Sequence, residues 1–494
     1  MKRIRPILNT NLHFIWVILF FTIHGYNKYY HLVPIGALLI LLGELLLAGT
    51  VLFWINTMLF RDKRKSGIFT SLILAVTLFF GAFQDFFAGI EILSVLSYLR
   101  LLIIICLVGL VAVYLLLKKA KLNFRKAIMY LNSLLIIYLL IDICSIFSQL
   151  FFPSAVSEKT FKQFKVSDCD SCKTPSVYLI LMDEYLGSHG LKEYFDYNNG
   201  NFEKFLTDQG FKVIRNPTSN YQLTLFSMAS LLNMNYIPQF EELQLSNHYV
   251  YKKLLSLLKN NVVCEVFQEN GYKVVNLSNF EIQNAPGLDS PSELPQKIEL
   301  ITNQTMINRI GKYLPVWLAE MHLAKFQEKQ AVALATVNDE TIEKALQEGK
   351  KDNRSPVFVY VHLMMPHLPY VYDSLGKVNP SFHQKHLAGS TSDSDYLQYL
   401  VYTNRRISQF IGELQKATHN NAVILLMSDH GYRDGARRNS KFAYQTFNAV
   451  YLPTHNYNDW YDGMSNVNQF PILFNSVFGQ RIQILKDSIV QQAK

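Results

Sequence analysis

Apolar residues follow two different patterns along the chain, one up to residue 151 and another after it. The first part contains long apolar segments, each able to supply the roughly 20 residues with which a helix crosses a bilayer. These segments span residues 12–26, 33–60, 68–87, 98–117 and 127–151. A cleaved signal peptide does not explain the first segment, because four more follow it. The pattern predicts a helical transmembrane domain of five spans over residues 1–151.

Lysine and arginine gather in alternate loops between these predicted spans. The loops 27–31 and 84–91 are poor in positive charge. The other loops and the amino-terminal segment are rich in it, with Lys2, Arg3, Arg5, Arg61, Lys63, Arg64, Lys65, Lys118, Lys119, Lys121, Arg125 and Lys126. Because positively charged loops stay in the cytoplasm, the amino terminus is predicted to be cytoplasmic. Five crossings then place every residue after 151 outside the cytoplasm.

Beyond the spans, residues 152–174 lack apolar periodicity and are predicted to form a linker. Residues 175–494 alternate between apolar runs and amphipathic stretches. The predicted strands are 176–182, 211–214, 272–277, 357–363, 422–427 and 447–452, and the predicted helices are 202–209, 223–232, 252–270 and 396–417. This alternation predicts an extracytoplasmic α/β sandwich domain with a mostly parallel sheet.

The composition agrees with a chain that lies partly in lipid. Of the 494 residues, 50% are hydrophobic and only 17% are charged. The formal net charge is +9, but the basic clusters flank apolar segments, which indicates membrane topology and no nucleic-acid partner. Cys169 and Cys172 follow the last span as Cys-Asp-Ser-Cys. A structural zinc site would need a second pair, so a local disulfide is favoured over a redox or zinc role.

Two predicted strands are followed by residues of the types that bind metal ions in proteins. Strand 422–427 leads into Ser428-Asp429-His430-Gly431, and strand 176–182 leads into Asp183-Glu184. Open α/β sheets hold their sites at such strand ends, and carboxylate with imidazole suits a divalent metal such as zinc or manganese. Two simpler interpretations remain open. The first motif is also compatible with an ordinary turn, and the second with charges that interact with a helix dipole.

A hydroxyl and two imidazoles follow at further element ends. In Asn220-Tyr-Gln-Leu-Thr224-Leu-Phe-Ser227, Thr224 is predicted near the start of a helix, either as an N-cap or as a nucleophile toward phosphorus. The end of strand 357–363 and the loop after it read His362-Leu-Met-Met-Pro-His367-Leu-Pro-Tyr. An imidazole there can hydrogen-bond a phosphoryl oxygen or protonate a leaving group. His367 is the better candidate, since His362 is more simply a core histidine.

Taken in order, these motifs resemble those of the alkaline-phosphatase/sulfatase superfamily, most closely its membrane-bound branch of phosphoethanolamine transferases and lipoteichoic-acid-synthase-like phosphoglycerol transferases. Those proteins also join five amino-terminal spans to an extracytoplasmic catalytic domain. The resemblance implies that a divalent metal is held by Asp183, Thr224, Asp429 and His430, with Glu184 as a further carboxylate. It also implies that Thr224 is the nucleophile and that His367, and less directly His386, contact the substrate phosphate.

The implied reaction takes place at the cytoplasmic membrane of a bacterium. Thr224 takes a phosphoethanolamine or phosphoglycerol headgroup from a membrane phospholipid, and an envelope glycan or lipid then accepts it. The Cys/Ser-x-Pro-x-Arg motif that sulfatases oxidise to formylglycine is missing around Thr224, which disfavours sulfate-ester hydrolysis. The catalytic domain also lacks an obvious cysteine framework, which leaves the headgroup open. A hydrolase of phosphate or sulfate esters is the alternative, and a non-enzymatic envelope protein is a third.

Overall fold

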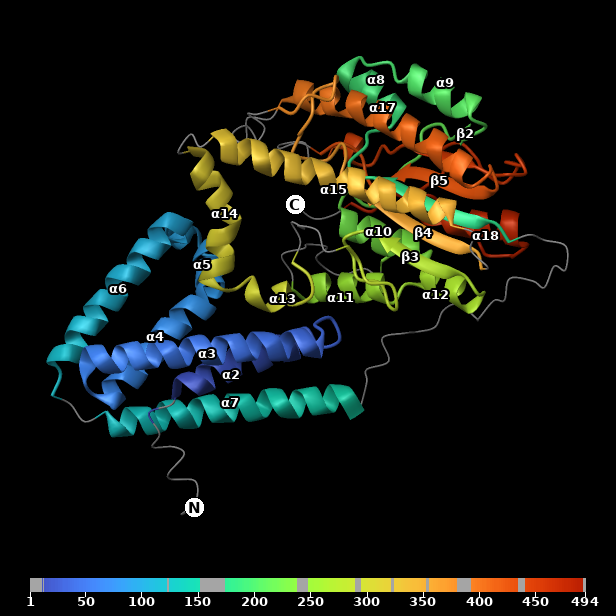
Figure 1. Ribbon diagram of the computed structural model, residues 1–494. Helices are drawn as coiled ribbons and strands as arrows, with labels where there is room; N and C mark the ends of the chain where they lie inside the picture. Colours follow the sequence, from blue (N-terminus) through green and yellow to red (C-terminus); the bar gives the residue numbers. More distant parts are fainter. Residues whose placement is uncertain are drawn as a thin grey trace. The chain divides into compact units, whose positions relative to one another are not determined.

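A computed structural model describes most of the chain (Figure 1). The described residues are 11, 13–121, 124–151, 174–237, 248–288, 295–320, 324–351, 355–379, 392–433 and 440–491. The chain forms two compact units, of which the first comprises residues 1–158 and 292–315 and the second comprises 159–291 and 316–494. The domain bounds 1–151, 152–174 and 175–494 stay predictions. The inclusion of residues 292–315 in the first unit was not predicted.

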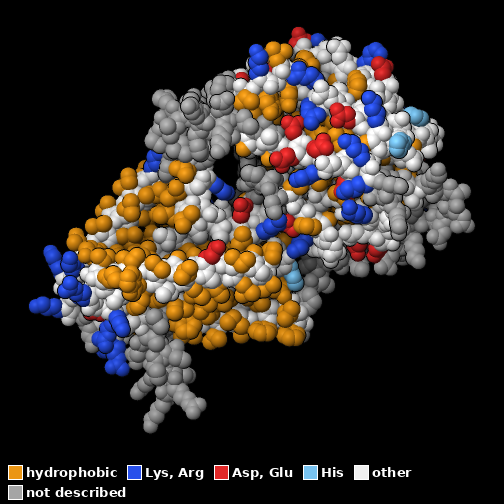
Figure 2. Space-filling view, in the orientation of Figure 1, with side chains coloured by type: hydrophobic (Ala, Val, Ile, Leu, Met, Phe, Trp, Pro, Cys, Tyr) orange, Lys and Arg blue, Asp and Glu red, His pale blue; other side chains and the backbone are white. Residues whose placement is uncertain are grey.

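The first unit is helical. Its elements are α2 (His13–Lys28), α3 (Ile35–Phe60), α4 (Lys63–Leu78), α5 (Phe80–Ala88), the 3-10 helix η1 (Glu91–Ser97), α6 (Leu99–Lys119), α7 (Arg125–Phe151), α13 (Glu299–Thr302) and part of α14 (Met306–Glu320). By length and composition α3, α6 and α7 can each cross a membrane, and α4 with α5, bent by 55°, is a fourth candidate. Their apolar side chains cover much of this unit in Figure 2. The described part of α2 has only 16 residues, so the count of five spans stays a prediction.

Two of the loops predicted to be cytoplasmic lie together in this unit. Asp62 caps α4 by accepting hydrogen bonds from the backbone N–H groups of Arg64 and Lys65. Lys65 Nζ donates to the carbonyl oxygen of Ala120, just after α6, over 2.7 Å. The basic ends of α4 and α6 therefore share one face of the unit, as the positive-inside orientation requires.

Residues 295–315, which belong to the first unit although they follow β3 (Lys273–Leu277) in sequence, contact α5 through a backbone hydrogen bond and an ion pair. The N–H of Gly81 donates to the carbonyl oxygen of Gln304 over 2.7 Å. Arg309 Nη2 pairs with Asp85 Oδ2 over 2.9 Å. A Cβ on Gly81 would lie 3.0 Å from the Arg309 guanidinium, so glycine leaves room for this close approach.

The second unit is built on a six-stranded mixed sheet. Its strands are β1 (Ser176–Met182), β2 (Lys212–Val213), β3 (Lys273–Leu277), β4 (Val357–Leu363), β5 (Ala422–Ser428) and β6 (Asn448–Tyr451), in the spatial order β2-β6-β5-β1-β4-β3. The pairs β5–β1, β1–β4 and β4–β3 are parallel, whereas β6 pairs antiparallel with β5 and with β2. The predicted α/β class is confirmed, and the antiparallel edge is a feature that the alternation of elements did not reveal.

Helices cover both faces of this sheet (Figure 1). One face carries α8 (Ser188–Phe195), α9 (Gly200–Asp208), α15 (Ala324–Lys350) and α17 (Asp393–Ala417). The other carries α10 (Thr224–Asn233), α11 (His248–Lys259), α12 (Val262–Glu269) and α18 (Gln469–Phe478). The 3-10 helices η3 (Lys441–Ala443) and η4 (Asn466–Asn468) lie in the loops that flank β6.

The central strands are buried on both sides, as their unbroken apolar runs predict. Along β4, Val359 and Val361 belong to the core that includes side chains of α15 and α17. Next to Val359 in sequence, Phe358 points to the opposite face and stacks on Phe267 of α12 with ring centroids 4.3 Å apart. If β4 slipped by one residue along its neighbours, the side chains packed on one face of the sheet would move to the other face. The packing on both faces therefore fixes the register of β4. A rigid sheet thus positions the loops at its carboxyl edge.

Candidate active site

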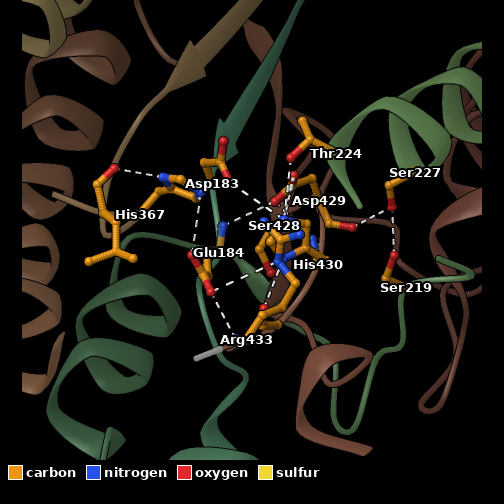
Figure 3. Close-up of polar contacts among 12 residues, drawn as sticks. Asp183, Glu184, Ser219, Thr224, Ser227, His367, Ser428, Asp429, His430 and Arg433 are labelled. Carbon is orange, nitrogen blue, oxygen red and sulfur yellow. Dashed lines mark hydrogen bonds and ion pairs between the residues drawn. The ribbon is translucent and has the colours of Figure 1, made fainter. Parts of the chain in front are cut away.

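Asp183 and Asp429 directly follow the ends of two adjacent parallel strands, β1 and β5, and so lie at the same edge of the sheet. β1 and β5 pair with Met182 opposite Ser428, so the next residue of each strand is one of the two aspartates. Figure 3 shows both side chains gathered with His430 at this edge. His430 Nε2 lies 3.6 Å from Asp183 Oδ1 and 3.4 Å from Asp429 Oδ2. One ligand atom from each of the three buried residues lies within 4.8 Å of the others. The spacing fits a single metal ion.

The tautomer of His430 leaves a lone pair directed at this cluster. Nδ1 lies 2.8 Å from the carbonyl oxygen of Gly431, and since a carbonyl only accepts, Nδ1 must carry the proton. Burial lowers the pKa of His430 well below its usual value, so the ring is neutral and Nε2 is unprotonated. A neutral imidazole whose other nitrogen donates to a carbonyl is the form in which histidine binds a metal.

Gly431 allows the chain to turn tightly after His430. A Cβ at this position would lie 2.0 Å from the carbonyl oxygen of Phe442 and 2.4 Å from that of Gln445. The Gly431 N–H donates to the carbonyl oxygen of Ala443 over 2.8 Å. Since backbone atoms cannot give way, the glycine of the Asp-His-Gly motif is required by close packing.

The two aspartates form a buried pair of like charges. Asp429 Oδ1 accepts from the backbone N–H groups of Glu184 and His430 over 3.1 and 2.8 Å. Burial, and then the nearby Asp183 carboxylate, raise the pKa of Asp429 to about 7. Burial also opposes the charged form of Asp183, but the imidazoles of His367 and His362 outweigh it and hold the pKa of Asp183 below its usual value.

One oxygen of each carboxylate has no hydrogen-bond partner. Among the described residues, Asp183 Oδ1 and Asp429 Oδ2 are both buried and without a donor. Leaving a buried charged acceptor unpaired costs on the order of 1–3 kcal/mol or more. A divalent cation between the two oxygens would satisfy both and offset their repulsion. The residues present therefore fit a divalent metal.

Thr224 is the first residue of α10, and its hydroxyl faces the cluster. Its Oγ1 lies 3.3 Å from His430 Nε2. The N-cap of α10 is Leu223, which makes no side-chain capping bond, so the N-cap alternative for Thr224 is wrong. The hydroxyl of Thr224 is therefore free of a capping role and lies where a nucleophile would contact a metal.

A second hydroxyl of α10, that of Ser227, forms a hydrogen bond with the backbone at the end of strand β5. Ser227 Oγ donates to the carbonyl oxygen of Asp429 over 2.5 Å and lies 2.6 Å from Ser219 Oγ. Asn466 Nδ2 donates to the carbonyl oxygens of Ser428 and Asp429 over 3.0 and 3.2 Å. These buried bonds fix the distance between Thr224 and the strand end. The spacing of Thr224 and Ser227 by one helical turn was visible in the sequence, but the contribution of Asn466 was not.

Glu184 is turned away from the three clustered ligands. Its backbone has φ of 62°, in the left-handed region. Its Oε1 accepts from the Arg433 N–H over 2.8 Å, and its Oε2 lies 3.5 Å from His367 Nε2 (Figure 3). Burial raises the pKa of Glu184 above its usual value, and the neighbouring His367 and Arg433 offset only part of this rise. In this structure its carboxylate thus orients His367 and Arg433, and its role as a metal ligand stays a prediction.

The histidine at the end of β4 and the one in the loop after it differ in their contacts. His362, expected in the core, is buried, but its Nε2 lies 3.4 Å from Asp183 Oδ2 and its Nδ1 2.8 Å from the Tyr360 hydroxyl. It therefore positions a candidate metal ligand. His367 Nδ1 donates to the carbonyl oxygen of Leu368 over 2.7 Å, which directs Nε2 toward Glu184. His386, Cys169 and Cys172 lie outside the described residues.

A family model named Sulfatase matches residues 219–482, which is more than half of the chain. The chain belongs to the sulfatase family. The match includes Thr224, His367, Asp429 and His430, and it confirms the resemblance of the ordered motifs to that superfamily. No curated protein matches the sequence. The sulfatase family is therefore established, while the substrate is not.

The chain is also similar to several solved structures. The chain is similar to the C-terminal periplasmic domain of EcEptC from Escherichia coli, with 13% identity, a TM-score of 0.35 and coverage of 60% of this chain and 80% of that one. It is also similar to the corresponding domain of phosphoethanolamine transferase EptC from Campylobacter jejuni, with 15% identity, a TM-score of 0.38 and coverage of 64% and 95%. A third is the phosphonate monoester hydrolase of Agrobacterium radiobacter, with 14% identity, a TM-score of 0.36 and coverage of 62% and 74%.

Proposed function

We propose that this member of the sulfatase family is a membrane-bound, metal-dependent phosphotransferase. It would move a phosphoethanolamine or phosphoglycerol headgroup from a phospholipid onto an envelope glycan or lipid. The observation that supports the proposal most is the Thr224 hydroxyl, 3.3 Å from His430 Nε2 at the edge of a buried Asp/Asp/His cluster. A threonine cannot become formylglycine, the group with which sulfatases hydrolyse sulfate esters.

Asp183, Asp429 and His430 would hold the metal, zinc or manganese, together with the Thr224 oxygen. When bound, such a cation lowers the pKa of a hydroxyl and offsets the negative charge that gathers on phosphorus in the transition state. The unpaired oxygens of Asp183 and Asp429 support this assignment.

In the first half-reaction, Thr224 Oγ gives up its proton to the surrounding water and attacks phosphorus. A bond from Oγ to phosphorus forms, and the bond from phosphorus to the glycerol oxygen breaks. The leaving oxygen takes up a proton and departs as diacylglycerol. His367 is the candidate to hold a phosphoryl oxygen or to supply this proton, and Glu184 positions its ring from 3.5 Å. In the second half-reaction an acceptor hydroxyl gives up its proton to water and attacks phosphorus. The bond from phosphorus to Thr224 Oγ breaks, and Oγ takes up a proton that restores the threonine.

The proposed setting is the cytoplasmic membrane of a bacterium, with the second unit outside the cytoplasm. The apolar helices of the first unit and the basic loops that meet at the ends of α4 and α6 support this orientation. A donor phospholipid and an envelope acceptor would both be found on that side.

The alternative is a hydrolase of phosphate or sulfate esters, which membership of the sulfatase family favours. A hydrolase and a transferase differ in how the covalent Thr224 intermediate is cleaved. In a hydrolase water cleaves it, whereas in a transferase it persists until an acceptor hydroxyl reacts. The protein can be reconstituted in phospholipid vesicles with zinc or manganese and without any acceptor. We expect a burst of about one diacylglycerol per active site, followed by a much slower rate, because the adduct waits for an acceptor. Steady release of diacylglycerol and free headgroup would instead show a hydrolase.

A further inference from the structure

Tyr396, near the start of α17, contacts the turn that follows β1. Its side chain is fully buried in the core of the second unit. Its hydroxyl donates to the carbonyl oxygen of Glu184 over 2.9 Å and accepts from the backbone N–H of Leu186 over 3.0 Å. A single side chain of α17 therefore bonds two backbone groups of the segment that carries Glu184.

The hydroxyl and the ring of Tyr396 have separate contacts. Burial raises the pKa of Tyr396 well above its usual value, so the O–H stays protonated and remains a donor. The ring packs against that of Tyr432, with centroids 4.2 Å apart, and stacks on that of Phe195 at 5.4 Å. Phenylalanine at this position would keep the ring contacts and lose only the two hydrogen bonds.

The hydrogen bond from Tyr396 supports an unusual backbone conformation. Glu184 has φ of 62°, in the left-handed region, which costs free energy for a residue other than glycine. Its N–H donates to Asp429 Oδ1 over 3.1 Å, and its carbonyl oxygen accepts from Tyr396. Both backbone polar groups of Glu184 are thus bonded in this conformation, and together they fix the direction in which its side chain leaves the backbone.

That direction brings the Glu184 carboxylate to His367 (Figure 3). Its Oε2 lies 3.5 Å from His367 Nε2, and its Oε1 accepts from the Arg433 N–H over 2.8 Å. On the other side of the ring, His367 Nδ1 donates to the carbonyl oxygen of Leu368 over 2.7 Å. The imidazole is therefore oriented from both nitrogens. A change in the backbone of Glu184 would move its carboxylate away from one of them.

We infer that the Tyr396 hydroxyl is a positioning group, which orients His367 through Glu184. It holds Glu184 in the left-handed conformation, and the Glu184 carboxylate in turn holds the imidazole. As far as it concerns turnover, the inference rests on the proposed function, in which His367 contacts the transferred phosphate. The conformation of Glu184 does not depend on turnover.

The kinetic test measures diacylglycerol release in phospholipid vesicles with zinc, for Tyr396→Phe alone and combined with His367→Ala. We expect Tyr396→Phe to lower turnover by about tenfold, a part of the roughly 100-fold to 10,000-fold that a positioned acid–base group contributes. In the His367→Ala background the same change should cost less than about twofold, because no imidazole is left to orient. An equal loss in both backgrounds would overturn the inference, since it would show a general structural effect.

Tyr451→Phe is the matched control. Tyr451 is a buried tyrosine of β6, and its hydroxyl also donates to a backbone carbonyl, that of Asn420, over 3.1 Å. This change should leave turnover within about twofold of the unchanged protein. Thermal unfolding of each variant shows that the fold is kept.

A crystal structure of the full-length Tyr396→Phe protein tests the inference without turnover. We expect Glu184 to leave the left-handed region and its carboxylate to move out of contact with His367. If Glu184 keeps its conformation and stays 3.5 Å from His367, the inference is overturned. If the unchanged protein released no diacylglycerol, the proposed function would fail, and the position of Glu184 in this variant would still decide whether Tyr396 holds it.

Discussion

Replacing Thr224 with alanine is expected to lower turnover by roughly a thousandfold or more, because the covalent step then has no nucleophile. The fold should survive. Thr224 does not cap α10, and its hydroxyl contacts His430 and Asp429 of the site. Diacylglycerol release in phospholipid vesicles measures the loss, and thermal unfolding measures the fold.

Two further variants make this result specific. Thr224→Ser keeps a hydroxyl at the same place and should retain part of the activity. Thr454→Ala removes an exposed threonine hydroxyl after β6 and should leave activity unchanged. If Thr224→Ala keeps more than about a tenth of the turnover with a normal unfolding temperature, Thr224 is not the nucleophile.

Replacing Asp429 with asparagine is expected to abolish metal binding without unfolding the protein. Asparagine keeps an oxygen for the two backbone N–H groups that Asp429 Oδ1 now accepts from. Its amide group, however, replaces the unpaired Oδ2 with a donor that cannot bind a cation. Removing one of two buried like charges should leave the metal-free protein at least as stable as before.

The measurement compares unfolding temperatures with and without zinc. A ligand at 100 times its Kd stabilises by about 2.7 kcal/mol, which corresponds to a rise in Tm of roughly 4 °C for a unit of this size. We expect this rise in the unchanged protein and not in Asp429→Asn. Asp462→Asn, an exposed aspartate bonded to the Arg215 backbone, is the control and should keep the rise. A full zinc-dependent shift in Asp429→Asn would exclude the proposed metal site.

The sequence was sufficient for the parts of the fold that follow from local patterns. Unbroken apolar runs predicted the buried strands β1, β4 and β5, because a strand covered on both faces has no polar side. The abrupt change to Asp183 and Asp429 marked their carboxyl ends. In a parallel sheet those ends meet at one edge, and the register between Met182 and Ser428 puts the two aspartates together there.

Local sequence patterns did not predict the contacts between residues that lie far apart in the sequence. The pairing of β6 with β5 and the two-residue strand β2 depends on which edges meet, and the local sequence does not encode this. The contact of His362 with Asp183 depends on the β1–β4 register. The contact of residues 295–315 with α5 includes a backbone bond, an ion pair and a side-chain hydrogen bond from Arg309 to Gln84, and none of these has a periodic signature.

The central claim is that Thr224 carries the transferred group between donor and acceptor. Intact-mass analysis of the protein purified from bacterial membranes tests it most directly, with peptide mapping of residues 219–230 to locate any adduct. We expect a fraction of the molecules to be heavier by one phosphoethanolamine or phosphoglycerol group, with the added mass on Thr224 and absent from Thr224→Ala. The account would be contradicted if Thr224 stayed unmodified after incubation with donor vesicles and metal, under conditions in which diacylglycerol is released.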